Sequence, residues 1–285
     1  MTAGVGPALV SAVCFGLTDV FAGLLSRRAH SAAVALLGQV AGTAAVLALA
    51  VGAPSAGAEP SALGWGALSG VGTGLGAALL FRAMGRGRFS VVVPLTVVAG
   101  VALPVLAGVL LLHDRPGVWA WAGIAASLPA VWLMSGSGRT ADGTADGLAP
   151  TAGVRTALLA GVAFALQYTA LAQAGPAAGL WPLAANRIVS VLTILPLVLA
   201  RPSRLRMPFA VAAGSAGTGL VSAAAIASYA LAAGAGELPV VVVLTSMYPA
   251  IPVLLGLTAL RERLSGAQLA GLGGAAAAVV LISVG

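Results

Sequence analysis

Residues 246–283 read SMYPAIPVLLGLTALRERLSGAQLAGLGGAAAAVVLIS, two apolar runs separated by the polar turn RERLS. A related pattern occurs 148 residues earlier, where ALPVLAG at 102–108 aligns with AIPVLLG at 250–256. The same shift aligns Asp114-Arg115 with Glu262-Arg263, and residues 91–135 share 15 identities with 239–283 over 45 positions. The matched proline, glycine and acid–arginine pair predict an internal repeat.

Outward from this segment, the chain consists of further apolar runs, most of them close to the 20 or so residues that an α-helix needs to cross a bilayer. Ten helices are expected, at 5–25, 32–52, 62–84, 90–112, 117–135, 153–173, 178–200, 208–233, 238–260 and 265–284. The polar stretch SGSGRTADGTADGLAPT at 135–151 contains Asp-Gly pairs that favour turns. We therefore expect a first five-helix repeat at 1–135, a polar linker at 136–152 and a second five-helix repeat at 153–285.

The composition excludes a soluble domain. Only 7% of the 285 residues are charged and 60% are apolar, with a mean hydropathy of +1.06, whereas soluble domains carry roughly 25% charged residues. We expect an all-α polytopic protein of the cell membrane, surrounded by the lipid bilayer. The net charge of +7 does not indicate nucleic-acid binding, because the 14 arginines stand singly or in small groups between apolar runs.

The arginines predict the orientation of the chain. Twelve of the 14 lie in the loops and helix ends that follow the odd-numbered expected helices. The positive-inside rule places these loops in the cytoplasm and both termini outside. With five helices in each half, the second half must enter the membrane upside down, so the two repeats are inverted. Trp65, Trp119, Trp121 and Trp181 are expected at the outer interface, where an aromatic belt forms.

Two ionisable residues, Asp19 and Arg187, lie inside expected spans. A charge at the bilayer centre costs at least about 2.5–3.5 kcal/mol, so such residues are candidates for function. Two interpretations explain these buried charges: a binding or proton-linked site, and a structural ion pair. If their helices face one cavity, a direct or water-bridged pair is expected.

Further polar side chains lie at comparable depths. The shift of 148 puts Gln39 opposite Arg187, and a shift of 149 puts Asp19 opposite Tyr168. A substrate site on an internal axis would require polar groups at such equivalent positions, although each side chain alone is equally explained by a hydrogen bond between helices. The candidate substrate-binding residues are Asp19, Gln39, Gln167, Tyr168, Asn186, Arg187, Tyr229, Thr245 and Tyr248.

Proline and glycine suggest where helices bend and where they pack. Pro104 and Pro252 match under the repeat, and each is explained either by a hinge or by a static kink. The run GVGTGLG at 70–76 contains two overlapping G-x-x-x-G spacings and predicts close helix packing. It is not a phosphate loop, since no Lys-Ser or Lys-Thr follows it.

No enzyme activity, metal or cofactor is expected. His30 and His113 stand at loop edges, Cys14 is the only cysteine, and no HExxH motif or Cys/His cluster occurs.

Segment 246–283 resembles helices nine and ten of EamA-type transporters of the drug/metabolite transporter superfamily. Its counterpart PLTVVAGVALPVLAGVLLLHDRPGVWAWAG at 94–123 is a weaker copy, with Asp114 in place of the usual Glu. Arg187, within AANRIVSVL, resembles the arginine that many members carry early in helix seven. Many members have cytoplasmic termini, whereas the arginine distribution here predicts the reverse.

The resemblance implies a secondary transporter that moves a small organic metabolite, such as an amino acid or a drug, by alternating access around a central cavity. Export is one expected direction, protons are the candidate coupling ion, and the protein would act as a monomer or a homodimer. Two alternatives stay open: a non-transporting membrane scaffold or partner subunit, and a lipid-handling protein.

Overall fold

The computed structural model describes residues 4–52, 59–107, 109, 117–135, 153–174, 179–235, 244–245 and 247–284. These residues form ten α-helices and one short 3-10 helix, with no strand among them. Six helices are long and apolar enough to cross a membrane. Shorter apolar helices run over Phe89–Leu103, Val118–Met134 and Gly266–Ile282. The prediction of an all-α polytopic fold is confirmed.

The helices agree closely with the expected spans, with one exception. The first half contains α1 (Val5–Leu25), α2 (Ser31–Gly52), α3 (Pro60–Arg86), α4 (Phe89–Ala107) and α5 (Val118–Ser135). The second half contains α6 (Val154–Gln173), α7 (Trp181–Leu199), η3 (Pro202–Leu205), α8 (Phe209–Ala235), α10 (Ala250–Thr258) and α11 (Gly266–Val284).

The exception is the span expected at 238–260. Within it the structure describes residues 244–245 as helical, a turn at 247–249 and helix α10 from Ala250. Pro249 is the N-cap and Pro252 lies in the first turn, where a missing N–H removes no helical hydrogen bond. These prolines therefore fit a helix start better than a bend within a long helix. Asp114, Arg115 and the linker at 136–152 lie outside the described residues.

Corresponding helices of the two halves have nearly the same bounds. Adding 148 to α1 gives 153–173, against 154–173 for α6, and adding 148 to α5 gives 266–283, against 266–284 for α11. The packing is reciprocal as well: α3 packs on α6 and α7, and α8 packs on α1 and α2. The equivalent helices α2 and α7 also contact each other, as do α5 and α11. This is the arrangement expected of two related five-helix units, and the repeat itself stays a prediction.

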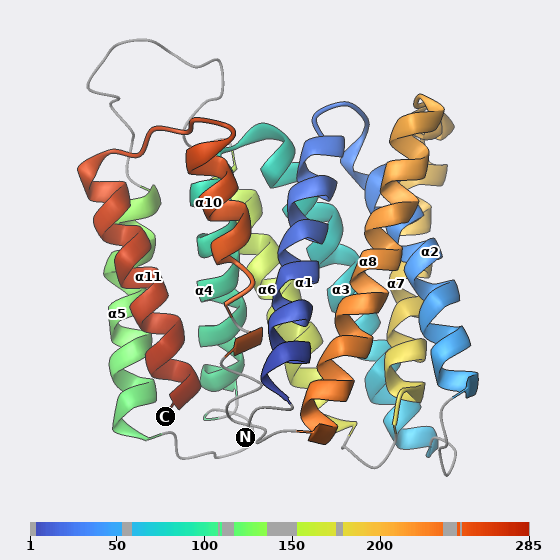
Figure 1. The fold of residues 1–285 in the computed structure, drawn as a ribbon, viewed down its shortest axis with the longest axis horizontal. Coiled ribbons are helices and arrows are strands. Elements are labelled where there is room, and N and C mark those ends of the chain that lie inside the picture. The colour runs from blue at the N-terminus through green and yellow to red at the C-terminus, as the bar shows by residue number, and fades with distance from the viewer. Residues whose placement is uncertain are drawn as a thin grey trace.

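Both termini lie at the same end of the bundle, and the arginine-rich connections lie at the other (Figure 1). The helix ends that carry Trp65, Trp119, Trp121 and Trp181 belong to the end with the termini. At the arginine-rich end, partial burial and then the charges of nearby arginines, Arg204 foremost, lower the pKa of His30. The two ends of the molecule therefore differ sharply in charge.

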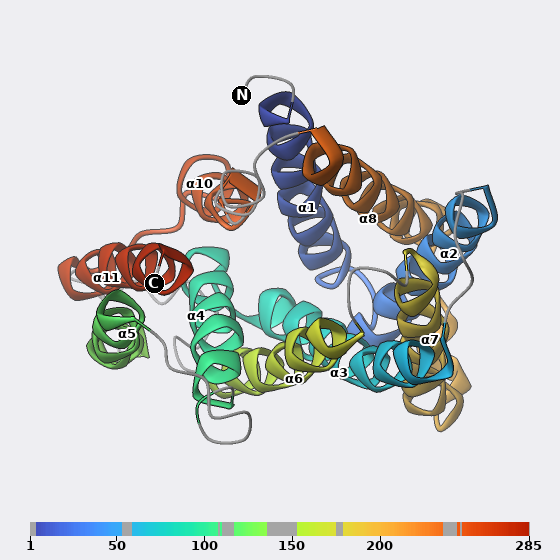
Figure 2. The same ribbon diagram turned by 90° about the horizontal axis from the view of Figure 1, so that it is seen from below.

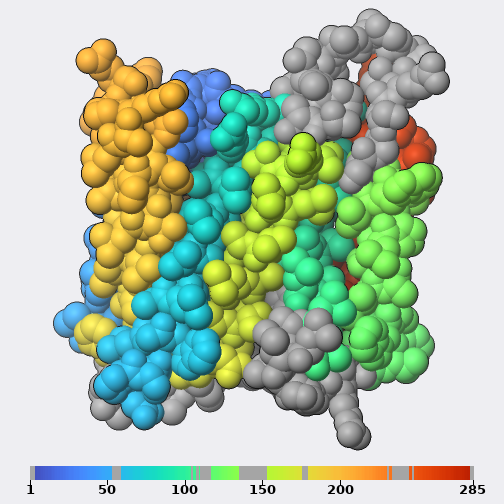
Figure 3. Space-filling model, turned by 180° about the vertical axis from the view of Figure 1, so that it is seen from behind, coloured from blue at the N-terminus to red at the C-terminus, as the bar shows by residue number. Residues whose placement is uncertain are grey.

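The glycine run of α3 packs against two helices of the second half. A Cβ on Gly70 would collide with the Asn186 carbonyl oxygen of α7, and one on Gly72 would lie 2.5 Å from the Ala163 carbonyl oxygen of α6. Only glycine permits backbones to approach so closely. Figure 3 shows α3, in cyan, beside α6, in yellow-green. The predicted role of the run in close packing is confirmed.

Candidate functional site

Arg187 lies on α7 with 8% of its surface exposed, and its charge is shared among neutral oxygens. Its Nη1 donates to Gln39 Oε1 of α2 at 2.8 Å, and its Nη2 donates to Ser222 Oγ of α8 at 2.9 Å. The buried Nε has no hydrogen-bond partner among the described residues. Because burying an unpaired charge is costly, a cation held this way favours a ligand that brings negative charge or further acceptors.

The Gln39 side chain is the shared acceptor of this group. The Ser190 hydroxyl lies 3.1 Å from Gln39 Oε1 and 2.8 Å from the Arg187 carbonyl oxygen. We call Gln39, Arg187, Ser190 and Ser222 the arginine cluster. It joins α2, α7 and α8, and its two long side chains are those that the repeat places at equivalent positions.

Asn186 precedes Arg187 but faces a different neighbour. Its Nδ2 donates to Ser69 Oγ at 2.6 Å and to Thr73 Oγ1 at 2.7 Å, both on α3. Asn186 is only 2% exposed. In this structure it fastens α7 to the glycine face of α3, which is what the interhelical hydrogen-bond interpretation predicts for it.

Asp19, Tyr168 and Tyr248 form a second group, the aspartate cluster, from α1, α6 and the turn before α10. The phenol groups of Tyr168 and Tyr248 are close enough to interact with each other, and the Asp19 carboxyl group is close enough to act electrostatically on both. The Phe15 ring packs on Tyr248 with the ring centroids 6.1 Å apart. The structure thus brings together three predicted residues from distant parts of the chain.

Asp19 and Arg187 do not form an ion pair. The salt bridge found in the described part of the chain joins Arg27 to Glu262 instead, and no hydrogen bond holds the Asp19 carboxyl group there. The reason is their position: Arg187 turns into the space between α2 and α8, whereas Asp19 acts on residues of α6 and the α10 turn. The direct pair that the sequence suggested is therefore not formed.

Helix α8 connects the two clusters. The Thr18 hydroxyl, next to Asp19, bonds the Cys14 carbonyl oxygen at 2.9 Å and lies 3.5 Å from the Thr218 carbonyl oxygen of α8. Ser222, which holds Arg187, follows Thr218 by four residues, about one helical turn and about 6 Å along the helix. The two clusters therefore lie within about one turn of each other in depth.

The remaining candidates differ in their surroundings. Gln167 Oε1 and Thr245 Oγ1 are buried and lack a hydrogen-bond partner among the described residues, and such atoms mark places for water or a ligand. Tyr229 is half-buried and packs on Ala8 and Ala232. Pro104 lies near the end of α4 and Pro252 in the first turn of α10, and their hinge role stays a prediction.

Sequence reasoning missed the hydroxyl partners. Ser190 and Ser222 hold the arginine cluster, and Ser69 and Thr73 hold Asn186. Ser69 and Thr73 are one turn apart on α3. This spacing, which puts two hydroxyl groups on one face of the helix, could have identified them. Isolated serines carry no such signal, because small hydroxyl residues are also common where apolar helices pack.

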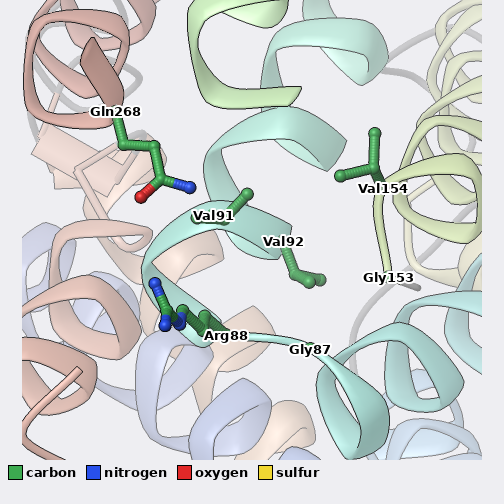
Figure 4. A pocket seen from close by; sticks show the side chains of 7 residues that line it. All are labelled: Gly87, Arg88, Val91, Val92, Gly153, Val154 and Gln268. Carbon is green, nitrogen blue, oxygen red and sulfur yellow. The ribbon is translucent and has the colours of Figure 1, made fainter. Parts of the chain in front are cut away.

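A small cavity lies away from both clusters, at the arginine-rich end (Figure 4). It is lined by Gly87, Arg88, Val91, Val92, Gly153, Val154 and Gln268. Its volume of about 10 Å³ holds about one water molecule, so it is too small for an organic solute. Among the described residues no group of three His, Cys, Asp or Glu side chains could hold a metal ion.

Comparisons with known proteins show the fold of the chain and a family match for its first half. A solved structure described only as "Crystal structure of protein" is 16% identical, with a TM-score of 0.59 over 97% of this chain and 95% of that one, which shows a shared fold. No curated protein matches the chain. Residues 2–136, the first five-helix half, match the EamA-like transporter family. Through this match the first half of the chain is assigned to the EamA-like transporter family of the drug/metabolite transporter superfamily, whose members are polytopic membrane transporters.

Proposed function

We propose that the chain is a secondary transporter, and not an enzyme, that moves a small organic solute across the cell membrane by alternating access. The two clusters form its binding region, between repeats at 1–135 and 153–285. The observation that carries the proposal is Asp19: a carboxyl group on a membrane-spanning helix, without an ion pair among the described residues, facing two tyrosines from other helices.

The two unpaired charges indicate which solutes fit. Asp19 offers a negative charge without a cation among the described residues, which favours a solute with an amino group, while two phenol groups offer ring faces and hydroxyls. Arg187 has only neutral partners and an unused Nε, which favours an acidic group or a carbonyl on the same solute. A phosphorylated solute fits less well, because a phosphate dianion favours several cations and the other arginines of the described helices lie toward helix ends.

The orphan oxygens of Gln167 and Thr245 add hydrogen-bonding capacity to the binding region. Gln167 adjoins Tyr168 on α6, and Thr245 precedes Tyr248 in the segment leading to α10. Both therefore lie close in sequence to residues of the aspartate cluster. Protons are the coupling ion that we propose, with Asp19 as their acceptor when no solute is bound, and export is the proposed direction.

Reconstituted protein tests this function. Proteoliposomes are given a panel of radiolabelled amino acids, amines, nucleosides and drugs, with and without a pH gradient. We expect exchange or gradient-dependent flux of at least one solute that carries an amino group, above the flux of protein-free liposomes. A scaffold would move none of the panel, and a lipid-handling protein would instead scramble fluorescent lipids. Absence of flux across the whole panel would contradict the proposal.

A further inference from the structure

A buried carboxylate ties the second half of the chain to the first at the arginine-rich end. Glu262 lies in the connection between α10 and α11, and its side chain is 7% exposed. Oε1 accepts the Phe89 N–H at 2.9 Å, while Oε2 accepts the Ser90 N–H at 2.9 Å and the Ser90 hydroxyl at 2.6 Å. Phe89 and Ser90 begin α4, so Glu262 caps the positive end of a helix far away in the sequence.

Two arginines reinforce this contact. Arg27, from the turn after α1, places Nη2 3.8 Å from Glu262 Oε1 and its guanidinium carbon 4.8 Å from the centroid of the Phe89 ring. Arg88, which is 8% exposed, donates from Nη1 to the Arg263 carbonyl oxygen at 2.7 Å. The connections α1–α2, α3–α4 and α10–α11 therefore meet at one point.

The backbone around Glu262 is shaped for this contact. Arg261 adopts φ 52°, the one positive φ of a non-glycine residue among those described. Such strain persists only where surrounding contacts enforce it. A Cβ on Gly256 would lie 2.7 Å from Glu262 Oε2, so glycine at that position leaves room for the carboxylate. The Glu262 N–H itself bonds the Gly256 carbonyl oxygen at 2.9 Å.

Helix α10 connects this contact to the aspartate cluster. It begins two residues after Tyr248 and ends four residues before Glu262, and it packs on α1 and α4. Figure 1 and Figure 2 show α10 beside α1 and α4. A Cβ on Gly16 of α1 would lie 2.6 Å from Ile251 Cβ, so α1 and α10 are closely packed at this point. One short, closely packed helix therefore joins the segment of Tyr248 to the segment of Glu262.

We propose that Glu262 is the latch of a gate: its bonds hold the arginine-rich ends of α1, α4 and α10 together and break when the transporter opens to that side. This inference rests on the proposed function, because alternating access requires each end to close in turn. Several charge-assisted hydrogen bonds meet on this one residue. They can form together in the closed state and break together in the open state.

A cysteine reporter tests the latch without any transported solute. In a Cys14→Ala background, Asp19→Cys places a thiol in the binding region, at a side chain that makes no hydrogen bond or ion pair with the described residues. Its labelling by a membrane-impermeant maleimide, applied to the arginine-rich side of sealed vesicles, measures opening to that side. We expect Glu262→Gln to raise the labelling rate by roughly tenfold, the population shift that loss of charge-assisted hydrogen bonds produces.

Two further variants make the test specific. Glu59→Gln removes the same charge at the opposite end, where the Glu59 side chain caps nothing, and should leave the rate unchanged. Ser90→Ala removes only the 2.6 Å hydrogen bond and should raise the labelling rate less than Glu262→Gln does. It replaces Glu262→Gln as the test variant if that protein does not fold. Unchanged labelling in the latch variants would overturn the proposal. Solute flux is measured separately, in Cys14→Ala protein that keeps Asp19. Faster labelling without flux in that protein would support the latch and contradict transport, whereas flux with unchanged labelling would contradict the latch alone.

Discussion

Gln39 and Arg187 stand 148 residues apart, at positions that the predicted repeat makes equivalent, and their side chains are joined by a 2.8 Å hydrogen bond. Two positions related by a twofold axis contact each other only near that axis. If the predicted repeat holds, the bond marks where the internal axis passes between α2 and α7, and the proposed movement of the two halves would take place around the buried charge of Arg187.

The first prediction concerns this bond. Gln39→Glu gives Arg187 an internal counterion of nearly the same shape, so the buried cation no longer needs a ligand to neutralise it. We expect the purified variant to melt at the same temperature as the parent or higher. Solute flux should fall about tenfold or more, corresponding to about 1.4 kcal/mol of lost interaction. Thermal unfolding and proteoliposome flux, measured on one preparation, separate the two effects.

Gln39→Met serves as the control for shape. It removes the acceptor without adding charge, so we expect lower stability than in Gln39→Glu because Arg187 loses a partner. If Gln39→Glu carried solute as fast as the parent, the charge of Arg187 would have no part in binding.

The second prediction concerns Asp19. Asp19→Asn keeps the size of the side chain and removes its charge. Because no ion pair among the described residues depends on the carboxylate, we expect normal expression and an unchanged melting temperature. Flux of amino-bearing solutes should fall at least tenfold, the consequence of losing about 1.4 kcal/mol or more of binding, and the remainder should no longer respond to a pH gradient. Unaltered flux and pH response would remove Asp19 from the mechanism.

The sequence was most informative where a regular pattern decides the structure. Helices such as α1 and α5 could be placed within one or two residues, since long apolar runs interrupted by arginine leave few alternatives in lipid. The start of α10 could not, because Pro249 and Pro252 fit both a kink and a helix start. Contacts between the halves were harder still: Glu262 was recognisable as a repeat marker, but its partners at the start of α4 are 172 and 173 residues away.

A third prediction concerns the packing of α2 on α8. A Cβ on Gly219 would collide with the Gly38 carbonyl oxygen, so Gly219→Ala forces the helices apart. Overpacking typically costs about 1–3 kcal/mol, and we expect at least that here. Gly217 lies on the same helix, and a Cβ added there would have nothing within 4 Å, so Gly217→Ala should be neutral or stabilising by up to about 1 kcal/mol. Melting temperatures in detergent compare the pair directly, and equal temperatures would contradict the close approach.

The fourth prediction concerns orientation. In the structure both termini lie at the end opposite the arginine-rich connections, and the positive-inside rule places those connections in the cytoplasm. An alkaline phosphatase fused after Gly285 should therefore be active, since that enzyme folds only outside the cytoplasm, while a fluorescent protein at the same position should stay dark. Replacing Arg201, Arg204 and Arg206 by glutamine should weaken the bias and yield a mixed population, because basic residues near helix ends set topology. A cytoplasmic reading from the parent fusion would reverse the assignment and place the Glu262 latch on the outer side, where it would close the opposite gate.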